Sequence, residues 1–383
     1  YDIINRIFMA RPVNNFFKSF LGKKNPSVLG IDVGSASVKV VQMRRKKGKA
    51  ILETYGELAL GPYADLEVGR ATKLPPEQIV EALNDVLKEA NTTTRECAVS
   101  IPMRSSMVAS IQMPKLDKKQ MAKMVPIEAR KYIPVPISEV TLDWFVVPKV
   151  ESDEEETYEE NPKVKNVGRS EVLVVAIHND VLNNYSKVVT DAQLQASFFE
   201  IEMFSTIRSV IRSGDNSPNL ICDIGAGATK LYIVERGIVR DSHIINKGGQ
   251  NITMGISKSL GVSMEFAEKL KRNYGRNTAV QDNQIKEIID LTTSPIFSET
   301  NSVLLNFQKK YNRNIGKVYL VGGGALLEGL QQRANQLIGI ETIMGDPFGK
   351  LEAPAFLQGV LEKTGLAFAP AIGLGIRKLQ ELD

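Results

Sequence analysis

The sequence has little of the residue types that build several common kinds of functional site. Its 383 residues include two cysteines and two histidines. This excludes a histidine-rich metal centre, and two cysteines alone cannot form a zinc site. Cys97 and Cys222 lie in apolar, strand-like runs and are interpreted as small buried side chains. The excess of basic over acidic residues is only 48 − 44 = 4, so composition gives little support for nucleic-acid binding.

Long hydrophobic runs are also missing. The most apolar stretches, residues 172–177 and 366–374, are far shorter than the roughly 18–20 residues of a transmembrane helix. Residues 14–24 are too short, and too interrupted by Lys18, for a signal-peptide core. We therefore expect a cytoplasmic protein. Hydrophobic residues make up 43% and charged residues 24% of the chain, which is typical of globular proteins and excludes a disordered chain.

The length suits two or three packed domains. Residues 28–42 are predicted to form a strand, a tight turn and a strand, and the basic turn at 44–49 leads into a third strand. We interpret the basic turn as a solvated hairpin tip, with a phosphate or lipid contact as the alternative. The breaker-rich stretch 213–218 is typical of a domain boundary, and residues 219–239 then repeat the opening pattern. Helices are expected over 75–89, 117–132, 180–191, 198–211, 251–260, 263–273, 283–310 and 327–337, and after Pro370.

Between the two repeats, the pattern predicts a small α+β unit. Strands are expected at 106–113, 140–150 and 171–178, around the helix that carries Met121 and Met124. Seven acidic residues fall within 151–160. Such a block repels itself, so it indicates a solvated loop, with binding of a partner as the alternative.

The repeated units contain chemistry suited to phosphate. LGIDVGSASVKV (29–40) and LICDIGAGATKL (220–231) share Asp, an apolar residue, Gly, small residues and Lys. Glycine lets a phosphate approach the backbone amides, and successive amides form an anion site. The aspartate can hold the hydration shell of Mg²⁺. Lys39 can reach a β- or γ-phosphate as a point charge.

A third glycine-rich element follows a later strand. VYLVGGGALLEGL (318–330) predicts a strand, three glycines and a helix whose N-terminal amides can meet a phosphate or an adenosine. No GxxxxGK[ST] motif is present, which excludes a P-loop. A dinucleotide-binding fold is excluded because both Asp-x-Gly turns lead into strands rather than helices.

These three elements resemble the two phosphate motifs and the adenosine motif of the actin-like ATPase superfamily, which includes actin, chaperone ATPases, sugar kinases and FtsA. Further stretches resemble the PilM family of cytoplasmic type IV pilus assembly proteins. They are EARKYIPVPISEVTLDW (128–144), EIEMFSTIRS (200–209), KGGQNIT (247–253), FAEKLK (266–271) and FAPAIGLGIR (368–377). The resemblance runs from about Val28 to Arg377.

The resemblance implies a fold and a domain organisation. The expected fold is α/β, with two actin-like lobes built on duplicated ribonuclease-H-like cores and an inserted small α+β subdomain of the kind shared with FtsA. The long acidic loop departs from the compact hairpin expected in that subdomain. The expected divisions are an N-terminal extension at 1–25, a first lobe at 26–104 and 179–214, the inserted subdomain at 105–178 and a second lobe at 215–383.

The resemblance also implies roles at a bound nucleotide. Asp32 and Asp223 would hold Mg²⁺ through water from opposite sides of a cleft. Glu268 and Lys271 would touch the adenosine, with a surface ion pair as the alternative. Glu200 is a candidate for activating water, and a carboxylate at a helix N-terminus is its alternative, so no catalytic base is assigned. ATP or ADP would further be contacted by Gly34, Ser35, Ser37, Lys39, Gly225, Gly227, Thr229, Gly249, Gly322, Gly323 and Gly324.

The expected function is that of an ATP-binding scaffold, with at most slow hydrolysis, in the type IV pilus platform used for twitching motility. Its expected partners are the N-terminal cytoplasmic tail of a PilN-like inner-membrane protein and other platform and motor proteins. The tail would dock at about residues 105–178 and bring the protein to the inner face of the membrane. Met121 and Met124 would adapt to the peptide, with a role in the subdomain core as the alternative.

Three alternatives remain open at this stage. One is an FtsA-like, filament-forming cytoskeletal ATPase, and a less favoured one is a small-molecule kinase on the same fold. A third concerns residues 14–24, where Phe16, Phe17, Phe20 and Leu21 lie beside lysines. We expect these aromatics to pack on the first lobe, with weak docking to anionic lipid as the alternative.

Overall fold

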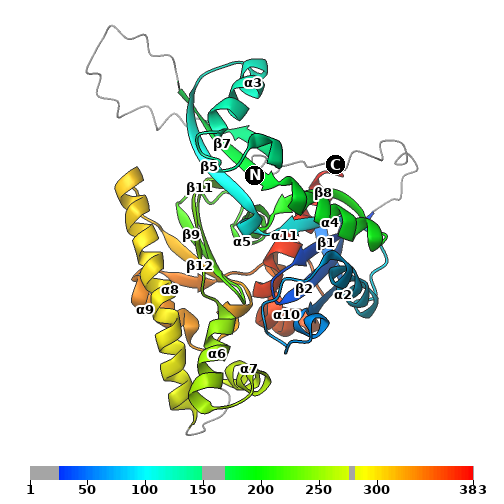
Figure 1. Cartoon of the computed structure of the whole chain (residues 1–383), viewed down its shortest axis with the longest axis vertical. Coiled ribbons are helices and arrows are strands. Elements are labelled where there is room, and N and C mark those ends of the chain that lie inside the picture. Colours follow the sequence, from blue (N-terminus) through cyan, green and yellow to red (C-terminus); the bar gives the residue numbers. More distant parts are fainter. Residues whose placement is uncertain (1–25, 149–168, 276–280, 383) are drawn as a thin grey trace.

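The computed structural model describes residues 26–148, 169–275 and 281–382. Two lobes lie side by side, and a small third unit projects from one end of the molecule (Figure 1). Each lobe contains a five-stranded sheet, and the projecting unit contains a three-stranded sheet. The predicted extension at 1–25 and the acidic stretch at 151–160 lie outside the described residues. Within the described part of the chain, no helix is long and apolar enough to cross a membrane.

The first lobe is built on a sheet of order β3-β2-β1-β4-β8. Its strands are β1 (Ser27–Val33), β2 (Ser37–Lys46), β3 (Lys49–Ala59), β4 (Glu96–Ile101) and β8 (Gln195–Ile201). The first three are antiparallel neighbours, whereas β1, β4 and β8 run parallel. Helices α2 (Pro76–Glu89) and α4 (Asn179–Asp191) pack against each other and the sheet. Proline at the start of α2 and its buried stripe of Leu83, Val86 and Leu87 explain why that helix forms there.

The second lobe repeats this arrangement with a different sequence. Its sheet has the order β11-β10-β9-β12-β13. The strands are β9 (Asn219–Ile224), β10 (Thr229–Glu235), β11 (Ile238–Ile245), β12 (Lys317–Val321) and β13 (Thr342–Met344), and the helices are α6 (Gly249–Leu260), α7 (Met264–Asn273), α8 (Gln281–Tyr311) and α9 (Leu330–Ile338). Three antiparallel strands are again followed by two parallel ones. The duplication predicted from the repeated motif is therefore confirmed.

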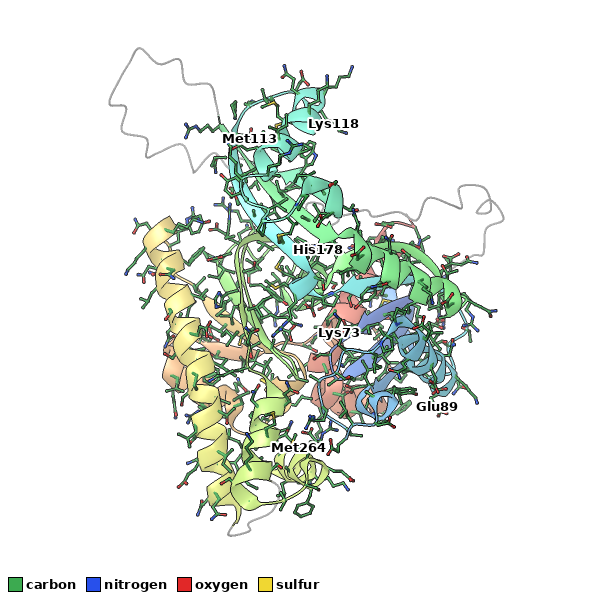
Figure 2. All side chains as sticks on the ribbon, in the orientation of Figure 1. Lys73, Glu89, Met113, Lys118, His178 and Met264 are labelled. Carbon is green, nitrogen blue, oxygen red and sulfur yellow. The ribbon has the colours of Figure 1, made fainter. Side chains whose placement is uncertain are left out.

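The projecting unit is the predicted inserted subdomain. Its sheet has the order β5-β7-β6, formed by Ser106–Pro114, Arg169–His178 and Val140–Val146. Helix α3 (Lys118–Ala129) begins at Asp117, whose side chain accepts hydrogen bonds from two backbone amides of the first turn. The subdomain has a core of its own around Met121, Val125 and Val172. In Figure 2, Met113 and Lys118 mark its far end and His178 its junction with the first lobe.

Two sequence predictions need correction near the junction of the lobes. The helix expected over 198–211 begins only at Glu202, as α5 (Glu202–Val210), because residues 198–201 belong to β8. Phe199 and Ile201 of that stretch are buried beside β4, and a short apolar run does not distinguish a buried strand from a helix.

The second correction concerns the C-terminal part of the predicted second lobe, 215–383. Phe348, Leu361 and helix α11 (Ala369–Gln380) pack on β1, β2 and β3 of the first lobe. Gly373 of α11 lies so close to α5 that a Cβ atom there would be 1.8 Å from the carbonyl oxygen of Ser205. The C-terminal residues therefore return to the first lobe and join it to the second.

Candidate functional site

The two Asp-x-Gly turns have the same geometry. Asp32 lies opposite Lys39 in the β1–β2 pair, and Asp223 lies opposite Lys230 in the β9–β10 pair. Each turn is closed by the amide of its glycine, Gly34 in one and Gly225 in the other, which donates to the carbonyl three residues later at 3.0 and 2.9 Å. Both sequence repeats thus place an aspartate at the end of a central strand and a lysine on its neighbour.

The turns approach each other between the lobes. A Cβ atom on Gly227 would lie 3.5 Å from the hydroxyl oxygen of Ser35 and 3.2 Å from the Cβ of Ala71. Ala71 belongs to a first-lobe loop, and its own amide donates to the side chain of Gln250 in the second lobe at 3.1 Å. The small residues predicted to cradle phosphates therefore come from both lobes and lie face to face.

The two aspartates belong to one charged cluster. Asp32 accepts a 2.6 Å hydrogen bond from Ser100. Lys230 contacts Glu202 at 2.5 Å and Asp223 at 3.3 Å. Burial raises the pKa of Glu202, and the carboxylates of Asp223 and Asp32 raise it further against the opposing effect of Lys230. Burial alone would lower the pKa of Lys230, but the carboxylates of Asp223, Glu202 and Asp32 raise it above its ordinary value.

Lys39 has different partners from Lys230. Its ammonium group donates to Ser37 at 2.6 Å and lies 3.3 Å from Glu57. Burial opposes ionisation of Glu57, but the Lys39 ammonium and the Ser37 hydroxyl together hold its pKa below its ordinary value. The Glu57 side chain is 46% exposed, so this pairing is accessible to water and to a competing anion.

The predicted adenosine contacts also converge. Glu268 and Lys271 form a 2.6 Å ion pair with side chains 7% and 15% exposed. Thr253 links them, donating to Glu268 at 2.6 Å and lying 2.9 Å from the Lys271 ammonium. A Cβ atom on Gly249 would lie 3.7 Å from that ammonium and 4.0 Å from the Cα of Gly324. The pair is therefore a buried part of the interlobe region rather than an ordinary surface ion pair.

The glycine run after β12 differs in one respect from its prediction. Gly322 has φ of +84°, and residues 323–326 form a short 3-10 turn, so α9 begins only at Leu330. A Cβ atom on Gly322 would lie 2.4 Å from a carboxylate oxygen of Asp223. The predicted helix start at 327 is thus wrong, because Gly329 with φ of +76° interrupts the chain there.

Two other predicted residues shape this region from a distance. The buried hydroxyl of Thr229 donates to the carbonyl of Lys247 at 2.8 Å. The amide of Gly249 donates to the carbonyl of Gly225 at 2.9 Å. Together these bonds hold the start of α6 on the second Asp-x-Gly turn.

Glu200 has an environment unsuited to activating water. Its side chain is fully buried, and Arg208 binds both carboxylate oxygens, at 2.8 and 2.9 Å. Arg377 of α11 donates to one of the same oxygens at 2.5 Å and stacks 4.2 Å from the centre of the Phe198 ring. Burial would raise the pKa of Glu200, but the two guanidinium groups hold it below its ordinary value. The carboxylate also lies at the end of β8 rather than at a helix N-terminus.

Sequence reasoning did not select Glu202, Lys230 or Ser100 for this site. The repeat contained a signal for Lys230, since it occupies the position of Lys39. Glu202 follows Glu200 by two residues. The sequence does not show that β8 ends between them, which places Glu200 with the two arginines and Glu202 in the cluster of Lys230. Nothing in the sequence pairs Ser100 with Asp32, because the bond joins neighbouring strands 68 residues apart.

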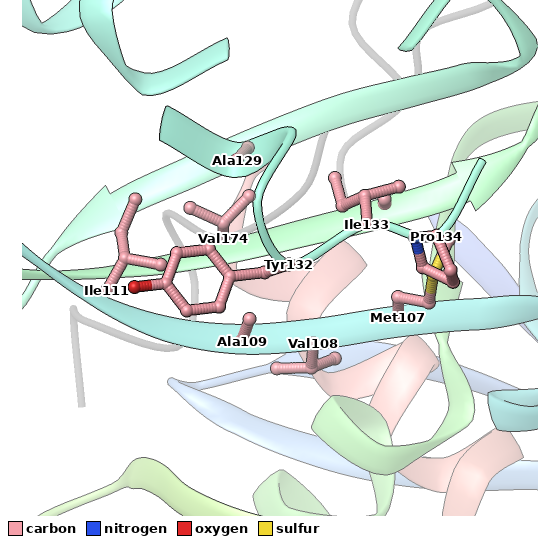
Figure 3. A pocket seen from close by; sticks show the side chains of 10 residues that line it. Met107, Val108, Ala109, Ile111, Ala129, Tyr132, Ile133, Pro134 and Val174 are labelled. Carbon is pink, nitrogen blue, oxygen red and sulfur yellow. The ribbon is translucent and has the colours of Figure 1, made fainter. Parts of the chain in front are cut away.

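A separate apolar pocket lies in the inserted subdomain. It has a volume of about 240 Å³ and is bounded by β5, β7 and the chain after α3. Tyr132, 51% exposed, lies across β5 beside Ala109 and Ile111 (Figure 3). Met121 is buried in the subdomain core, whereas Met124 is 41% exposed. Met121 therefore fills the subdomain core, which was the alternative considered for the two methionines, and a role of Met124 in binding a peptide stays a prediction.

This architecture is the actin-like ATPase fold, with paired turns between two duplicated lobes. Residues 30–379 match the family described as "Type IV pilus assembly protein PilM". The chain therefore belongs to the PilM family of type IV pilus assembly proteins.

Solved structures support the fold. A structure of a PilM–PilN type IV pilus biogenesis complex superposes with a TM-score of 0.76 at 23% identity, covering 92% of this chain and 98% of that one. MreB5 of Spiroplasma citri, solved with AMPPNP bound, superposes with a TM-score of 0.52 at 11% identity over 94% and 98% of the two chains. At these identities the likeness concerns the fold.

Among curated proteins, the chain is similar to the cell division protein FtsA. It is 26% identical over 181 residues to FtsA of Streptococcus pneumoniae, covering 42% of this chain and 40% of the relative. It is 24% identical over 208 residues to FtsA of Buchnera aphidicola, covering 48% and 49%. The chain thus matches less than half the length of these two relatives.

Proposed function

We propose that this chain is a nucleotide-binding scaffold of the type IV pilus assembly platform, which docks the cytoplasmic tail of a PilN-like membrane protein. Membership of the PilM family supports the place in the platform. The structure of a PilM–PilN complex, similar over 92% of this chain, supports the kind of partner. Docking through such a partner would hold the protein at the inner face of the membrane.

The observation that carries nucleotide binding is the approach of the two Asp-x-Gly turns to each other. Amides of both turns, together with Lys39, would bind the β- and γ-phosphates of ATP, or the β-phosphate of ADP. Gly249, Lys271 and the run Gly322–Gly324 would form the adenosine side. The buried Glu268 holds the Lys271 ammonium in place.

Asp32 and Asp223 fit a magnesium ion bound through water. Both carboxylates raise the pKa values of Glu202 and Lys230, so both lie near this pair. Within the described residues, no three His, Cys, Asp or Glu side chains converge to hold a metal directly. Mg²⁺ retains its waters readily, and when bound it would neutralise charge on the phosphates. Ser100 donates to one oxygen of Asp32 and so restricts the rotation of this carboxylate.

Glu202, rather than Glu200, is proposed to orient water at this site. Glu202 is the first residue of α5, and one of its carboxylate oxygens accepts a 2.8 Å hydrogen bond from the amide of Met103. The other oxygen contacts Lys230. Because the Met103 amide and the Lys230 ammonium already occupy both oxygens, Glu202 is poorly placed to take a proton from water. We therefore expect slow hydrolysis, below roughly one turnover per second. A phosphate-release assay would measure this rate.

The partner's tail is proposed to bind in the pocket beside β5. Strand β5 is an edge of the three-stranded sheet, and an extended peptide can add to such an edge while an apolar side chain fills a pocket. The exposed Tyr132 and the small Ala109 form the pocket opening. This position falls within the predicted docking range, 105–178.

A labelled peptide of the PilN-like tail, titrated against the full chain, tests the docking. Ala109→Arg places a long charged side chain in the pocket and should weaken binding at least ~10-fold, as expected for a buried unpaired charge. Phe266→Ala removes a side chain that is 49% exposed on α7 of the second lobe and serves as the control. Equal peptide affinity of wild type and Ala109→Arg would contradict the proposal.

A further inference from the structure

A basic pocket at the outer end of the first lobe has no part in the site described above. It has a volume of about 530 Å³ and is lined by Arg44, Lys46, Lys47 and Lys49, with Ile51, Leu52, Ala353 and Pro354 as its apolar walls. Lys47 and Gly48 have positive φ angles of 52° and 79°, as expected of a tight hairpin turn. Lys46 and Lys49 end the paired strands at the tip of this hairpin, and residues 46–49 are exposed to solvent.

Part of the positive charge of this pocket is not neutralised. Arg44 pairs with Glu53 at 3.1 Å, and Lys49 pairs with Glu352. Lys46 and Lys47, both exposed, have no ion-pair partner within the described ranges 26–148, 169–275 and 281–382. The pocket therefore offers two uncompensated ammonium groups beside two paired cations, which suits a phosphate-bearing ligand.

Exposed apolar side chains follow directly along the chain from the pocket wall. Residues 352–354 are fixed to β3, since Leu52 donates to the carbonyl of Glu352 at 2.9 Å and Glu352 donates to Ala50 at 2.8 Å. Helix α10 (Gln358–Thr364) then packs on the core through Leu361. Phe356, which precedes this helix, is 83% exposed, and Val360 within the helix is 47% exposed. Phe356 thus lies two residues along the chain from Pro354 of the pocket wall.

We propose that this surface, formed by residues 44–49 and 353–360, binds directly to membranes that contain anionic lipid. The lysines would contact lipid phosphates, while Phe356 and Val360 would enter the interface between headgroups and acyl chains. Basic residues near an anionic bilayer attract it additively, and exposed apolar side chains provide the second contribution that stable binding requires. An acidic protein could form ion pairs with the lysines, but these ion pairs would not account for the exposed Phe356, whereas a membrane would bind both.

The basic hairpin of this surface lies apart from the interlobe cluster. Arg44 is at the start of the β1–β2 pairing and Lys39 near its other end, close to the Asp-x-Gly turn. The proposal goes beyond the proposed docking of a membrane protein and does not depend on it. Lipid contact through the first lobe would add to attachment through the inserted subdomain.

Co-sedimentation of the full chain with lipid vesicles tests the proposal. The vesicles are phosphatidylcholine alone, or phosphatidylcholine mixed with phosphatidylglycerol, at low and near-physiological salt. We expect binding to the anionic vesicles that weakens as salt rises, and little binding to the neutral ones. Lys46→Glu/Lys47→Glu should weaken binding at least ~10-fold. Phe356→Ser should weaken it by a smaller factor that does not depend on salt.

The matched control is Lys118→Glu/Lys119→Glu, which makes the same charge change on exposed residues at the start of α3. This control should bind like the wild type, since its lysines lie on the inserted subdomain. Failure of the wild type to bind anionic vesicles would overturn the proposal, as would equal loss in both double variants. If a peptide of residues 149–168 binds the wild type but not Lys46→Glu/Lys47→Glu, while vesicle binding is the same for both proteins, the surface binds an acidic polypeptide and the lipid proposal is overturned.

Discussion

The two lobes have the same strand order and the same Asp–Lys register, yet their equivalent lysines have different partners. Lys39 of the first lobe contacts Ser37 and the half-exposed Glu57. Lys230 of the second lobe lies among the carboxylates of Glu202 and Asp223. Duplication thus preserved the backbone while the charges beside each lysine diverged. Lys39 is proposed to contact phosphate, whereas Lys230 neutralises acidic residues of the protein itself.

The largest effect is expected at the buried ion network that joins β8 of the first lobe to α5 and α11. Glu200→Gln would leave Arg208 and Arg377 buried without their carboxylate, so the free energy of unfolding should fall by about 4 kcal/mol. Urea denaturation measures this loss. The exposed Glu265→Gln is the control and should leave the denaturation midpoint unchanged.

This loss should depend on pH. The pKa of Glu200 in the folded protein lies below its ordinary value of 4.5. Its ion pairs therefore stabilise the fold above that value and stop doing so as the pH falls through the folded-state pKa. The difference between wild type and Glu200→Gln should narrow in acid. A difference that stays constant from neutral pH into acid would contradict ionisation of Glu200 in the fold.

The next effect compares the two equivalent lysines. Lys230→Ala leaves Glu202 and Asp223 without a cation and should reduce the free energy of unfolding by about 3 kcal/mol. Lys39→Ala should reduce it by at most about 1 kcal/mol, because its partner Glu57 is solvated. Equal losses in urea denaturation would show that the lysines have equivalent roles after all.

A smaller effect is expected in the glycine run after β12. Gly322→Ala combines a positive φ with a Cβ atom 2.4 Å from a carboxylate oxygen of Asp223, so it should cost about 2 kcal/mol. Gly323→Ala is the matched control, since its Cβ atom would meet only Ala367, at 4.0 Å. Thermal unfolding of the two variants separates strain at Gly322 from a general effect of replacing glycine.

Much of this architecture could be predicted from the sequence because the repeat fixes it locally. Asp-x-Gly turns with β-branched residues on both sides specify a hairpin through short-range interactions, and two copies indicate two similar lobes. The apolar residues of 76–89, spaced three and four apart, predict α2 for the same reason. The glycines and lysines proposed to bind phosphate could be predicted because they occur within the repeated motif itself.

The parts that sequence reasoning missed depend on contacts between distant segments. Arg377 reaches Glu200 across 177 positions, and this contact explains both the buried carboxylate and the return of α11 to the first lobe. Lys230 was visible in the repeat, but its role follows from its contact with Glu202, the first residue of α5. Periodicity also could not separate Phe199 and Ile201 in β8 from the helix that follows.

Calorimetric titration of Mg²⁺·ATP into the full chain tests most directly whether the facing Asp-x-Gly turns form the nucleotide site. We predict that the wild type binds and that Lys39→Ala binds about 10- to 100-fold more weakly, because a charge-assisted phosphate contact is lost. Lys269→Ala, which removes an exposed lysine of α7, should bind like the wild type. Equal affinity of wild type and Lys39→Ala, or no binding by the folded wild type, would contradict the account.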